Sequence, residues 1–472
     1  MPKTLGRNGI VGAVIVAAWL LLNAGRGLSA YFSPDDIMNM YWAWTEPWRR
    51  LVVANLIPFV SDSYRPLGAL VYRISLAPFG LNPIPLRILI YALLLVNAWL
   101  VYRLAKSLGG SNEIGFLAAF FMAFHHRLLD VYTNTGTIYD VLCGTFYLWT
   151  LLFYMRARER GRFRAFDYVV LYALVVATLN SKEIGATLPV MLLGYEVLYR
   201  RPGWRVVDAA PAWMAWVVTA LAIWRKMDAG SHFIGNTYYA IHLSWHQYFL
   251  TTRAFFNDLF LLPDNTFNSR AAAAVLLAVI AIAVVARRKY IWFCVLLIIV
   301  GPLPVNFIVP RGLFAIYVPM IGWAIFAAAV LVEGRDWLYT RVWKRAPLSR
   351  SPWEPERVFL FVALVGVLVN LQAHDRPLDW TFADWSKSSI YQLTDGLRRL
   401  NLEVSGKSSI LFFDDRFTRD DWIPVLLVRM MYRDPELRVE RAKTMDRRPE
   451  GAVLAGYSYV LDYEGDRLVL SR

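Results

Sequence analysis

Two adjacent carboxylates are the residues of this sequence that point most directly to chemistry. Asp35 and Asp36 follow the first hydrophobic segment, inside the short run YFSPDD at 31–36. Carboxylates at a membrane surface can bind a divalent metal ion such as Mg, Mn or Zn, or one of them can take a proton from an attacking hydroxyl group. The structural alternative is a helix N-cap, which the run from Ser33 suits well. Both interpretations stay open, and each can hold for a different residue of the pair.

Three further charged residues stand between apolar stretches, where a charge needs a partner. Lys182 and Glu183 occupy a tight turn between two apolar segments. They form ion pairs there or reach toward water, unless Lys182 holds a phosphate group as a point charge. Arg311 follows the proline-interrupted segment 301–310, and irregular backbone in a membrane lines a cavity or is buried in protein. Its guanidinium suits a phosphate or pyrophosphate group, with anchoring at the interface as the alternative.

Other candidate groups give weaker signals. His242 and His246 are spaced so that a helix would place both on one face, as a two-histidine metal site requires, but no third ligand is in evidence. Ordinary interfacial histidines are the simpler explanation for both and for His125–His126. Asp414–Asp415 follows a predicted strand, where acidic residues usually form turns, although this pair too could bind a metal.

The composition places the chain among polytopic membrane proteins. Hydrophobic residues make up 57% of it and 19 residues are tryptophan, far more than the core of a soluble domain needs. The formal net charge is +14, but acidic and basic residues balance from residue 374 onward. The basic excess therefore belongs to the membrane part and does not indicate nucleic acid binding. Cys143 and Cys294 lie in apolar stretches, which disfavours a disulfide framework or a cysteine metal site.

Hydropathy predicts about eleven membrane spans, since a bilayer core of ~30 Å takes roughly 20 apolar residues per helix. The predicted spans are 9–31, 86–105, 114–129, 138–155, 167–181, 184–199, 207–226, 271–286, 290–309, 313–332 and 358–373. A cytoplasmic N-terminus puts most loop arginines and lysines on the cytoplasmic side, as the positive-inside rule requires, with Arg225 and Lys226 as exceptions. A cleaved signal peptide is the alternative for the first span, but its apolar run is long.

This orientation brings the candidate polar groups to the outward side of the membrane. That side receives the Asp35–Asp36 loop, the turn at 125–140, the turn at 181–183, the stretch 227–270, Arg311 and the C-terminal tail. Segments 32–85 and 238–262 contain polar, proline or aromatic residues that do not suit a clean span, and they predict helices lying in the interface.

The tail changes character and predicts a small mixed domain. Alternating residues predict strands at 409–413, 457–463 and 467–470, the last two as a hairpin, with helices at 388–402 and 420–432. We therefore expect a polytopic α-helical membrane domain at 1–373 and a C-terminal extracytoplasmic α/β domain at 374–472, long enough for a core of its own.

The order of these motifs resembles the GT-C superfamily of membrane glycosyltransferases. The resemblance is carried by Asp35–Asp36 after the first span, YRPL at 64–67, FGLNP at 79–83 with Arg87, the turn SKE at 181–183, and Arg311 with YVP at 317–319. Within the superfamily the chain is most similar to the protein O-mannosyltransferase and lipid A aminoarabinose transferase branches. The SKE turn and the RPL stretch are similar to the tetratricopeptide-linked O-mannosyltransferases, although no such repeats follow here. The likeness covers residues 9–332.

The resemblance implies a GT-C-like helical bundle, a polyprenyl-phosphate sugar as donor, and inversion at the anomeric carbon. By that likeness Asp35 or Asp36 is the general base, and Lys182 and Arg311 hold the departing lipid phosphate. The further donor-site candidates are Glu183, Arg65 and Tyr317, and the additional candidates are Asp140 and His126. Some relatives bind a divalent metal through the loop carboxylates and others do not. Many relatives have Asp-Glu where this chain has Asp-Asp, so the resemblance does not choose the base.

The expected function is transfer of a sugar from a polyprenyl-phosphate donor to an acceptor hydroxyl on the outer face of the bacterial inner membrane. The partners are then the lipid-linked donor, membrane lipids and an acceptor that is a glycan, a lipid or a protein. One alternative is a transporter or flippase for lipid-linked sugars, which needs basic groups but no paired carboxylate at an interfacial loop. The other is a non-catalytic scaffold that keeps the GT-C fold.

Overall fold

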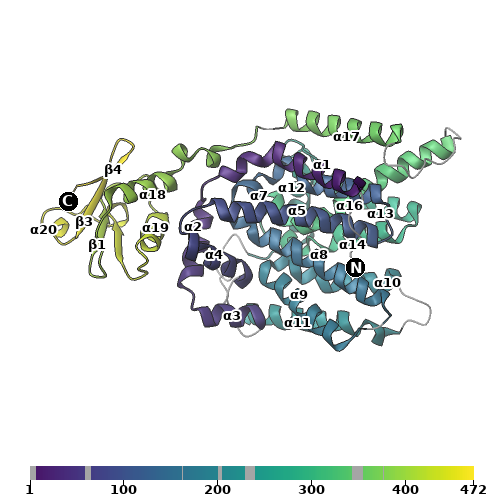
Figure 1. The fold of residues 1–472 in the computed structure, drawn as a ribbon, viewed down its shortest axis with the longest axis horizontal. Coiled ribbons are helices and arrows are strands. Elements are labelled where there is room, and N and C mark those ends of the chain that lie inside the picture. The colour runs from purple at the N-terminus through teal and green to yellow at the C-terminus, as the bar shows by residue number, and fades with distance from the viewer. Residues whose placement is uncertain are drawn as a thin grey trace.

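The computed structural model describes residues 7–58, 65–161, 163–199, 205–228, 240–342, 354–375 and 377–471. An elongated body of helices carries, at one end, a smaller domain that contains the strands (Figure 1). The C-terminal part of the chain forms this smaller domain (Figure 1).

The helical body contains the elements from α1 to α17. They are α1 (Arg7–Ala24), η1 (Gly25–Ser29), α2 (Pro34–Thr45), α3 (Trp48–Leu56), α4 (Pro66–Phe79), α5 (Ile84–Ser107), α6 (Asn112–Ala123), η2 (His126–Leu128), α7 (Leu129–Thr133), η3 (Thr135–Thr137), α8 (Ile138–Glu159), α9 (Ala165–Ser181), η4 (Glu183–Thr187), α10 (Leu188–Tyr199), η5 (Val206–Ala209), α11 (Ala210–Asp228), α12 (Trp245–Leu259), α13 (Ser269–Ala286), α14 (Lys289–Val300), α15 (Leu303–Asn306), η7 (Leu313–Ile316), α16 (Tyr317–Trp337), η8 (Leu338–Val342) and α17 (Pro355–His374).

Among the described residues, eight helices are long and apolar enough to cross a membrane, or nine if the bent pair of α6 with η2 and α7 is one span. Each of the eleven predicted segments contains helix, but the count of eleven full spans is not confirmed. Helix α9 has 17 residues and α10 has 12, and at about 1.5 Å per residue both are shorter than a ~30 Å bilayer core. A bend of 51° breaks the predicted span at 114–129.

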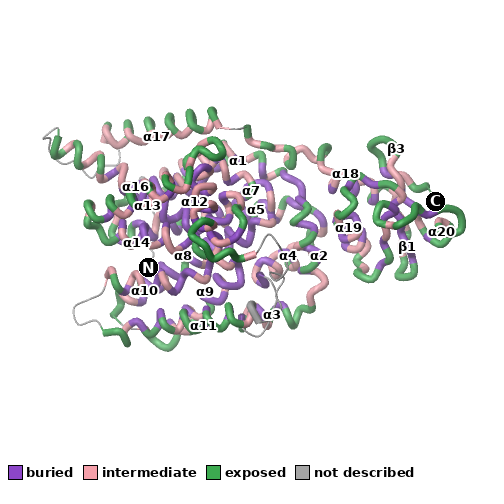
Figure 2. Tube along the Cα trace, turned by 180° about the vertical axis from the view of Figure 1, so that it is seen from behind, coloured by how far each residue is buried: buried purple, intermediate pink, exposed green. Residues whose placement is uncertain are grey.

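The perimeter of the helical body is apolar and exposed, while its interior is closely packed (Figure 2). Leu22 is 85% exposed and Val285 is 82% exposed, although both belong to candidate spans. Large apolar side chains facing outward all round a helical bundle are explained by contact with lipid. The chain is therefore a multi-pass membrane protein.

The predicted interfacial segment 32–85 forms short helices at the end of the body that faces the smaller domain (Figure 1). Helix α2 begins where the sequence provides a complete capping box: the Ser33 hydroxyl accepts from the backbone N–H of Asp36, whose carboxylate accepts from the N–H of Ser33. Pro34 occupies the first helical turn, where its missing N–H costs nothing. The second predicted interfacial segment, 238–262, contains α12, which begins only at Trp245.

The smaller domain is built on a four-stranded sheet in the order β2-β1-β3-β4. Its elements are η9 (Thr381–Ala383), η10 (Trp385–Lys387), α18 (Ser389–Leu400), β1 (Ser409–Phe412), α19 (Ile423–Met431), β2 (Arg438–Arg441), η11 (Ala442–Thr444), α20 (Ala452–Ala455), β3 (Tyr459–Glu464) and β4 (Arg467–Leu470). Strand β1 is parallel to β2 and β3, and β3 pairs with β4 as the predicted antiparallel hairpin. Strand β2 was not predicted, because its sequence RVER has a single apolar residue among three charged ones and gives no apolar alternation.

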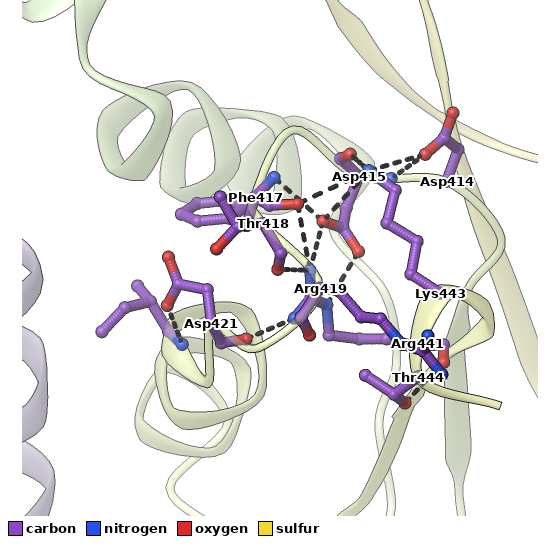
Figure 3. A network of polar contacts seen from close by, with 10 residues as sticks. Asp414, Asp415, Phe417, Thr418, Arg419, Asp421, Arg441, Lys443 and Thr444 are labelled. Atoms are coloured by element: carbon purple, nitrogen blue, oxygen red, sulfur yellow. Dashed lines mark hydrogen bonds and ion pairs between the residues drawn. The ribbon is translucent and has the colours of Figure 1, made fainter.

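Asp414 and Asp415 follow β1, and their surroundings are structural (Figure 3). The carboxylate of Asp415 is buried and accepts two hydrogen bonds from the Arg441 guanidinium, at 2.8 and 2.7 Å. Arg441 also donates to backbone carbonyls of the loop after β1, including that of Thr418 at 2.8 Å. Asp414 pairs with Lys443 at 3.0 Å. This cluster joins the carboxyl ends of β1 and β2.

Candidate functional site

Asp36 is completely buried, and both of its carboxylate oxygens are engaged. Oδ2 accepts from the backbone N–H of Ser33 at 2.7 Å and lies 3.8 Å from Nη2 of Arg87. Oδ1 accepts from the hydroxyl of Tyr72 at 3.2 Å and from that of Thr135. A carboxylate so completely held fixes the first turn of α2 against α4, α5 and η3, so the capping interpretation applies to Asp36.

The side chains of Tyr72 and Arg87, which contact Asp36, are fixed as well. Burial, and then the charge of Asp36, raise the pKa of Tyr72 well above its usual range, so its hydroxyl remains a donor. Arg87 is also fully buried and donates to the carbonyl oxygens of Ala30, at 3.2 Å, and Tyr31, at 2.8 Å. The segment before α2 is therefore held by the same arginine that pairs with Asp36.

Asp35 points the other way and is exposed. Within the described part of the chain it has no hydrogen bond or ion pair. Its Cβ lies 3.3 Å from the position that a Cβ on Gly136 would take, directly before α8. The Ser33 hydroxyl donates to the Asn134 side chain at 3.0 Å, which fixes the arrangement. An accessible carboxylate on a rigid helix turn can accept a proton from a bound hydroxyl group.

Lys182 lies at the end of α9 and is 5% exposed. Its ammonium donates to Oδ2 of Asp140, on the first turn of α8, at 2.8 Å. The same ammonium lies 5.6 Å from the ring centre of Phe314 in η7. The sequence left open whether Lys182 has an ion-pair partner, and the structure provides one in Asp140.

Arg65 forms a second ion pair in the same region. Its guanidinium makes two parallel hydrogen bonds to the Glu183 carboxylate, at 3.1 and 2.9 Å. Arg65 has a left-handed backbone with φ 47°, which costs a non-glycine residue about 1–2 kcal/mol. A strained backbone conformation of this kind persists only where surrounding contacts hold it, and such residues cluster at functional sites.

Tyr139 lies between the Asp36 cluster and the Arg65 pair. The Arg65 guanidinium stands 5.3 Å from its ring centre, and the Tyr72 ring centre is 6.1 Å away. Tyr139 interacts electrostatically with Arg65, Asp36 and Asp35. The carboxylates of α2 and the charged residues around the start of α8 therefore form one continuous region.

Arg311 and Tyr317 precede and begin α16. Arg311 is half-buried, and the η7 turn that follows it brings Phe314 to Lys182. Tyr317 is 1% exposed, and its hydroxyl accepts from the Asn97 side chain at 3.2 Å. The structure thus places Tyr317 in the packed interior of α5, α8 and α16, while Arg311 remains at the end of the bundle.

The histidine candidates lie in different places. His126 is buried with its Nε2 3.6 Å from the Asp375 carboxylate, which Arg127 also holds, with 2.6 Å between its Nε and Oδ2. This cluster fixes the end of α17 rather than the region of Asp35. His242 precedes α12 and its backbone N–H donates to Phe307, so His242 and His246 do not share a helix face.

The residues around Asp35 and Asp36 do not fit a metal site built on both carboxylates. Both oxygens of Asp36 already accept from protein donors, and the Arg87 guanidinium already places a positive charge 3.8 Å from Oδ2. No group of three or more histidine, cysteine or acidic residues suited to a metal occurs among the described residues. The chemistry proposed below therefore uses no metal.

Sequence reasoning missed three residues that complete the region, Tyr72, Thr135 and Tyr139. Thr135 belongs to the polar run TNTGT at 133–137, directly before a predicted span, and that run was the available signal. Tyr72 and Tyr139 gave none, because aromatic residues near the ends of spans are usually interface anchors.

Comparison with known proteins supports the motif order in part of the chain. Residues 63–225 match the family model described as dolichyl-phosphate-mannose-protein mannosyltransferase. That segment contains Arg65, Asp140, Lys182 and Glu183 but not Asp35. No curated protein matches the chain.

Two solved structures resemble the chain at low similarity. The Archaeoglobus fulgidus oligosaccharyltransferase tethered with an acceptor peptide containing the NVT sequon is 12% identical, with a TM-score of 0.49, over 91% of this chain and 63% of that chain. Oligosaccharyltransferase AglB from the same organism, in complex with an inhibitory peptide and a dolichol-phosphate, is 12% identical, with a TM-score of 0.49, over 89% of this chain and 64% of that chain.

The chain therefore spans less than two thirds of the length of these structures, and the similarity is too low to bear on its site or activity. The family match is different, since it covers the continuous stretch that holds the Lys182–Asp140 and Arg65–Glu183 ion pairs. It confirms, over residues 63–225, the resemblance to GT-C membrane glycosyltransferases that the motifs predict.

Proposed function

We propose that this protein is an inverting glycosyltransferase that moves a sugar from a polyprenyl phosphate to an acceptor hydroxyl. The observation that carries the proposal is that the two adjacent aspartates have different surroundings. Asp36 is buried and fixed, whereas Asp35 is exposed beside the start of α8 and has no hydrogen bond or ion pair in the described part of the chain. A rigidly held, accessible carboxylate is what a general base requires.

In this mechanism Asp35 removes the proton of the acceptor hydroxyl. The acceptor oxygen forms a bond to the anomeric carbon, and the bond from that carbon to the phosphate oxygen breaks. The polyprenyl phosphate leaves with the electron pair, so negative charge develops on it as the transition state is crossed. Cationic side chains placed at the departing phosphate stabilise that charge.

The cationic groups proposed for this role are Lys182, which follows α9, Arg65, which precedes α4, and Arg311, which precedes η7. Lys182 is neutralised by Asp140 and Arg65 by Glu183, so the four residues together carry no net charge. A donor phosphate would share the Lys182 ammonium with Asp140, and the Arg311 guanidinium would be a further hydrogen-bond donor to it. Lysine is a common phosphate partner because its three donors rotate freely.

The orientation follows from the same assignment. The α2–α4 helices and the smaller domain lie at one end of the helical body (Figure 1), and η3, directly before α8, contacts α2. We place this end on the outer face of the bacterial inner membrane, with the N-terminus in the cytoplasm, because the loop arginines and lysines then follow the positive-inside rule. Transport of a lipid-linked sugar does not require an accessible base such as Asp35. A non-catalytic scaffold does not require that this carboxylate be held rigidly on the first turn of α2.

Native mass spectrometry of the protein purified in mild detergent tests the donor assignment. Removing Lys182 alone would leave Asp140 buried without its partner, so the test variant is Lys182→Ala with Asp140→Asn and Arg311→Ala. We expect wild type to retain a polyprenyl phosphate, free or glycosylated, and the variant to lose most of it.

The matched control removes cations from the other end of the body, as Arg160→Ala with Lys289→Ala, and should retain the lipid. Equal retention by wild type and the test variant, or retention of no such lipid by wild type, would rule out the donor site.

A further inference from the structure

The segment 29–45, called the arm below, carries Asp35 and is held by the smaller domain at both of its ends. At its start, the indole N–H of Trp385 donates to the carbonyl oxygen of Ser29. The backbone N–H of Tyr31 donates to the carbonyl oxygen of Phe382 at 2.7 Å. These bonds join the helical body to residues more than three hundred positions away in the chain.

Aromatic rings strengthen this contact. The ring centre of Tyr31 lies 5.1 Å from that of Trp385 and 5.2 Å from that of Tyr391, both in edge-to-face arrangements. Such pairs contribute about 0.5–1.5 kcal/mol each beyond the area that they bury. Tyr31 is itself 2% exposed, so its ring is enclosed by the contact.

The contact leads directly to the aspartate pair. The carbonyl oxygen of Tyr31 accepts from Nη2 of Arg87 at 2.8 Å, and the same nitrogen lies 3.8 Å from Asp36. Asp36 caps α2, whose first turn carries Asp35. A continuous series of buried groups therefore connects Trp385 to the candidate base.

The other end of the arm meets α19, which packs along α2 (Figure 1). Nη1 of Arg429 lies 3.4 Å from the hydroxyl of Tyr41, and Nε of Arg429 donates to the carbonyl oxygen of Leu437 within its own domain. The chain leading into this domain is anchored as well, because Arg127 binds Asp375 at the end of α17.

We propose that the C-terminal domain is a positioning element of the transferase, which holds the arm so that Asp35 meets the acceptor hydroxyl. The inference rests on the proposed function for its catalytic consequence, but the coupling of domain to arm is a physical property that is measured without activity. A displacement of about 1 Å in a catalytic group can cost about 10²-fold in rate. Trp385 and Tyr391 are therefore positioning residues, since they act on the reaction through Tyr31.

The test uses the full-length protein and three variants. Trp385→Ala removes the ring and the indole N–H, and Trp385→Phe keeps a ring against Tyr31 while losing the hydrogen bond to Ser29. Arg416→Ala is the matched control, because Arg416 bonds to Asp466 and Gln392 inside the domain and, among the described residues, makes no hydrogen bond or ion pair with the arm. Three quantities are measured: amide hydrogen exchange over 30–45, kcat for transfer, and retention of the donor lipid.

For Trp385→Ala we expect exchange in the arm to rise about tenfold and kcat to fall by about ten- to a hundredfold, with donor retention unchanged. Trp385→Phe should lie between that variant and wild type in exchange and kcat, and Arg416→Ala should match wild type in all three measurements.

Unchanged exchange at 30–45 in Trp385→Ala would overturn the inference, whatever the activity. Raised exchange with an unchanged kcat would also overturn it, because the domain would then hold the arm without positioning the base. If wild type transfers no sugar, the proposed function fails, while the exchange measurement still decides whether the domain orders the arm.

Discussion

Two of the three pairs of adjacent aspartates in the chain, Asp35–Asp36 and Asp414–Asp415, are divided by the structure in the same way. Asp36 and Asp415 are buried and face an arginine, Arg87 and Arg441 respectively. Their neighbours Asp35 and Asp414 point outward. Two adjacent carboxylates in a sequence thus indicate neither a metal site nor two equivalent acids, because successive residues of a turn face different surroundings.

The exposed members differ in what surrounds them. Asp414 pairs with Lys443 at 3.0 Å, so its charge is balanced within its own turn, and the hydrogen bond from Lys443 lowers the pKa of its carboxyl group. Asp35 has no such cation in the described part of the chain and lies beside Gly136 at the start of α8. For this reason we infer a catalytic role for the Asp35–Asp36 pair and a purely structural role for the Asp414–Asp415 pair.

The largest expected effect is on the rate of transfer. Asp35→Asn removes the proposed base while keeping the size of the side chain, and the rate should fall by about 10²–10⁴-fold, the usual contribution of a general base. The measurement is the initial rate of donor consumption by purified protein in lipid. Asp414→Asn is the matched control and should transfer at the wild-type rate.

For the stability of the fold, the buried Asp36 is expected to matter more than the exposed Asp35. Asp36→Ala leaves Arg87 buried without its carboxylate and should destabilise the helical body by about 3–5 kcal/mol, whereas Asp35→Ala should stay within about 0.5 kcal/mol of wild type. Thermal unfolding in detergent, followed by tryptophan fluorescence, measures both. Equal stability of the two variants would contradict the division within this pair.

The smallest effect is expected in the smaller domain. The Asp414 side chain is 56% exposed in its pair with Lys443, and exposed ion pairs contribute about 0–1 kcal/mol. Asp414→Asn should therefore leave hydrogen exchange in β1 and β2 nearly unchanged, while Asp415→Asn should raise it strongly because Arg441 loses a buried partner. A large effect of Asp414→Asn would show that this exposed carboxylate also supports the fold.

Much of the architecture could be predicted from local patterns. Long apolar segments predict the helices, and the alternating strands around Glu464-Gly465-Asp466 predict the β3–β4 hairpin that the structure shows. A helix N-cap in the run from Ser33 was one of the two open predictions, and the structure shows it as a capping box whose members lie within one turn. The number of full spans could not be predicted, because the 3-10 turn η4 and the bend before His126 shorten segments that hydropathy alone treats as complete spans.

The partners of the charged residues could not be predicted, because they come from distant parts of the chain. Asp36 meets Thr135, Arg65 meets Glu183, and Lys182 meets Asp140 only after the helices pack. The family resemblance also assigned Tyr317 to the donor site through its motif, whereas its hydroxyl accepts a hydrogen bond from Asn97 in the interior. Charges between apolar stretches signal that partners exist, and packing decides which they are.

The most direct test of the central claim follows the lipid-linked sugar itself. Wild-type protein carrying its co-purified glycosylated polyprenyl phosphate is mixed with membranes that supply acceptor, and mass spectrometry follows the lipid through one turnover. We predict that the glycosylated lipid disappears as free polyprenyl phosphate appears in equal amount. A lipid that keeps its sugar throughout, in protein that is folded and in the presence of acceptor, would contradict the assignment as a glycosyltransferase.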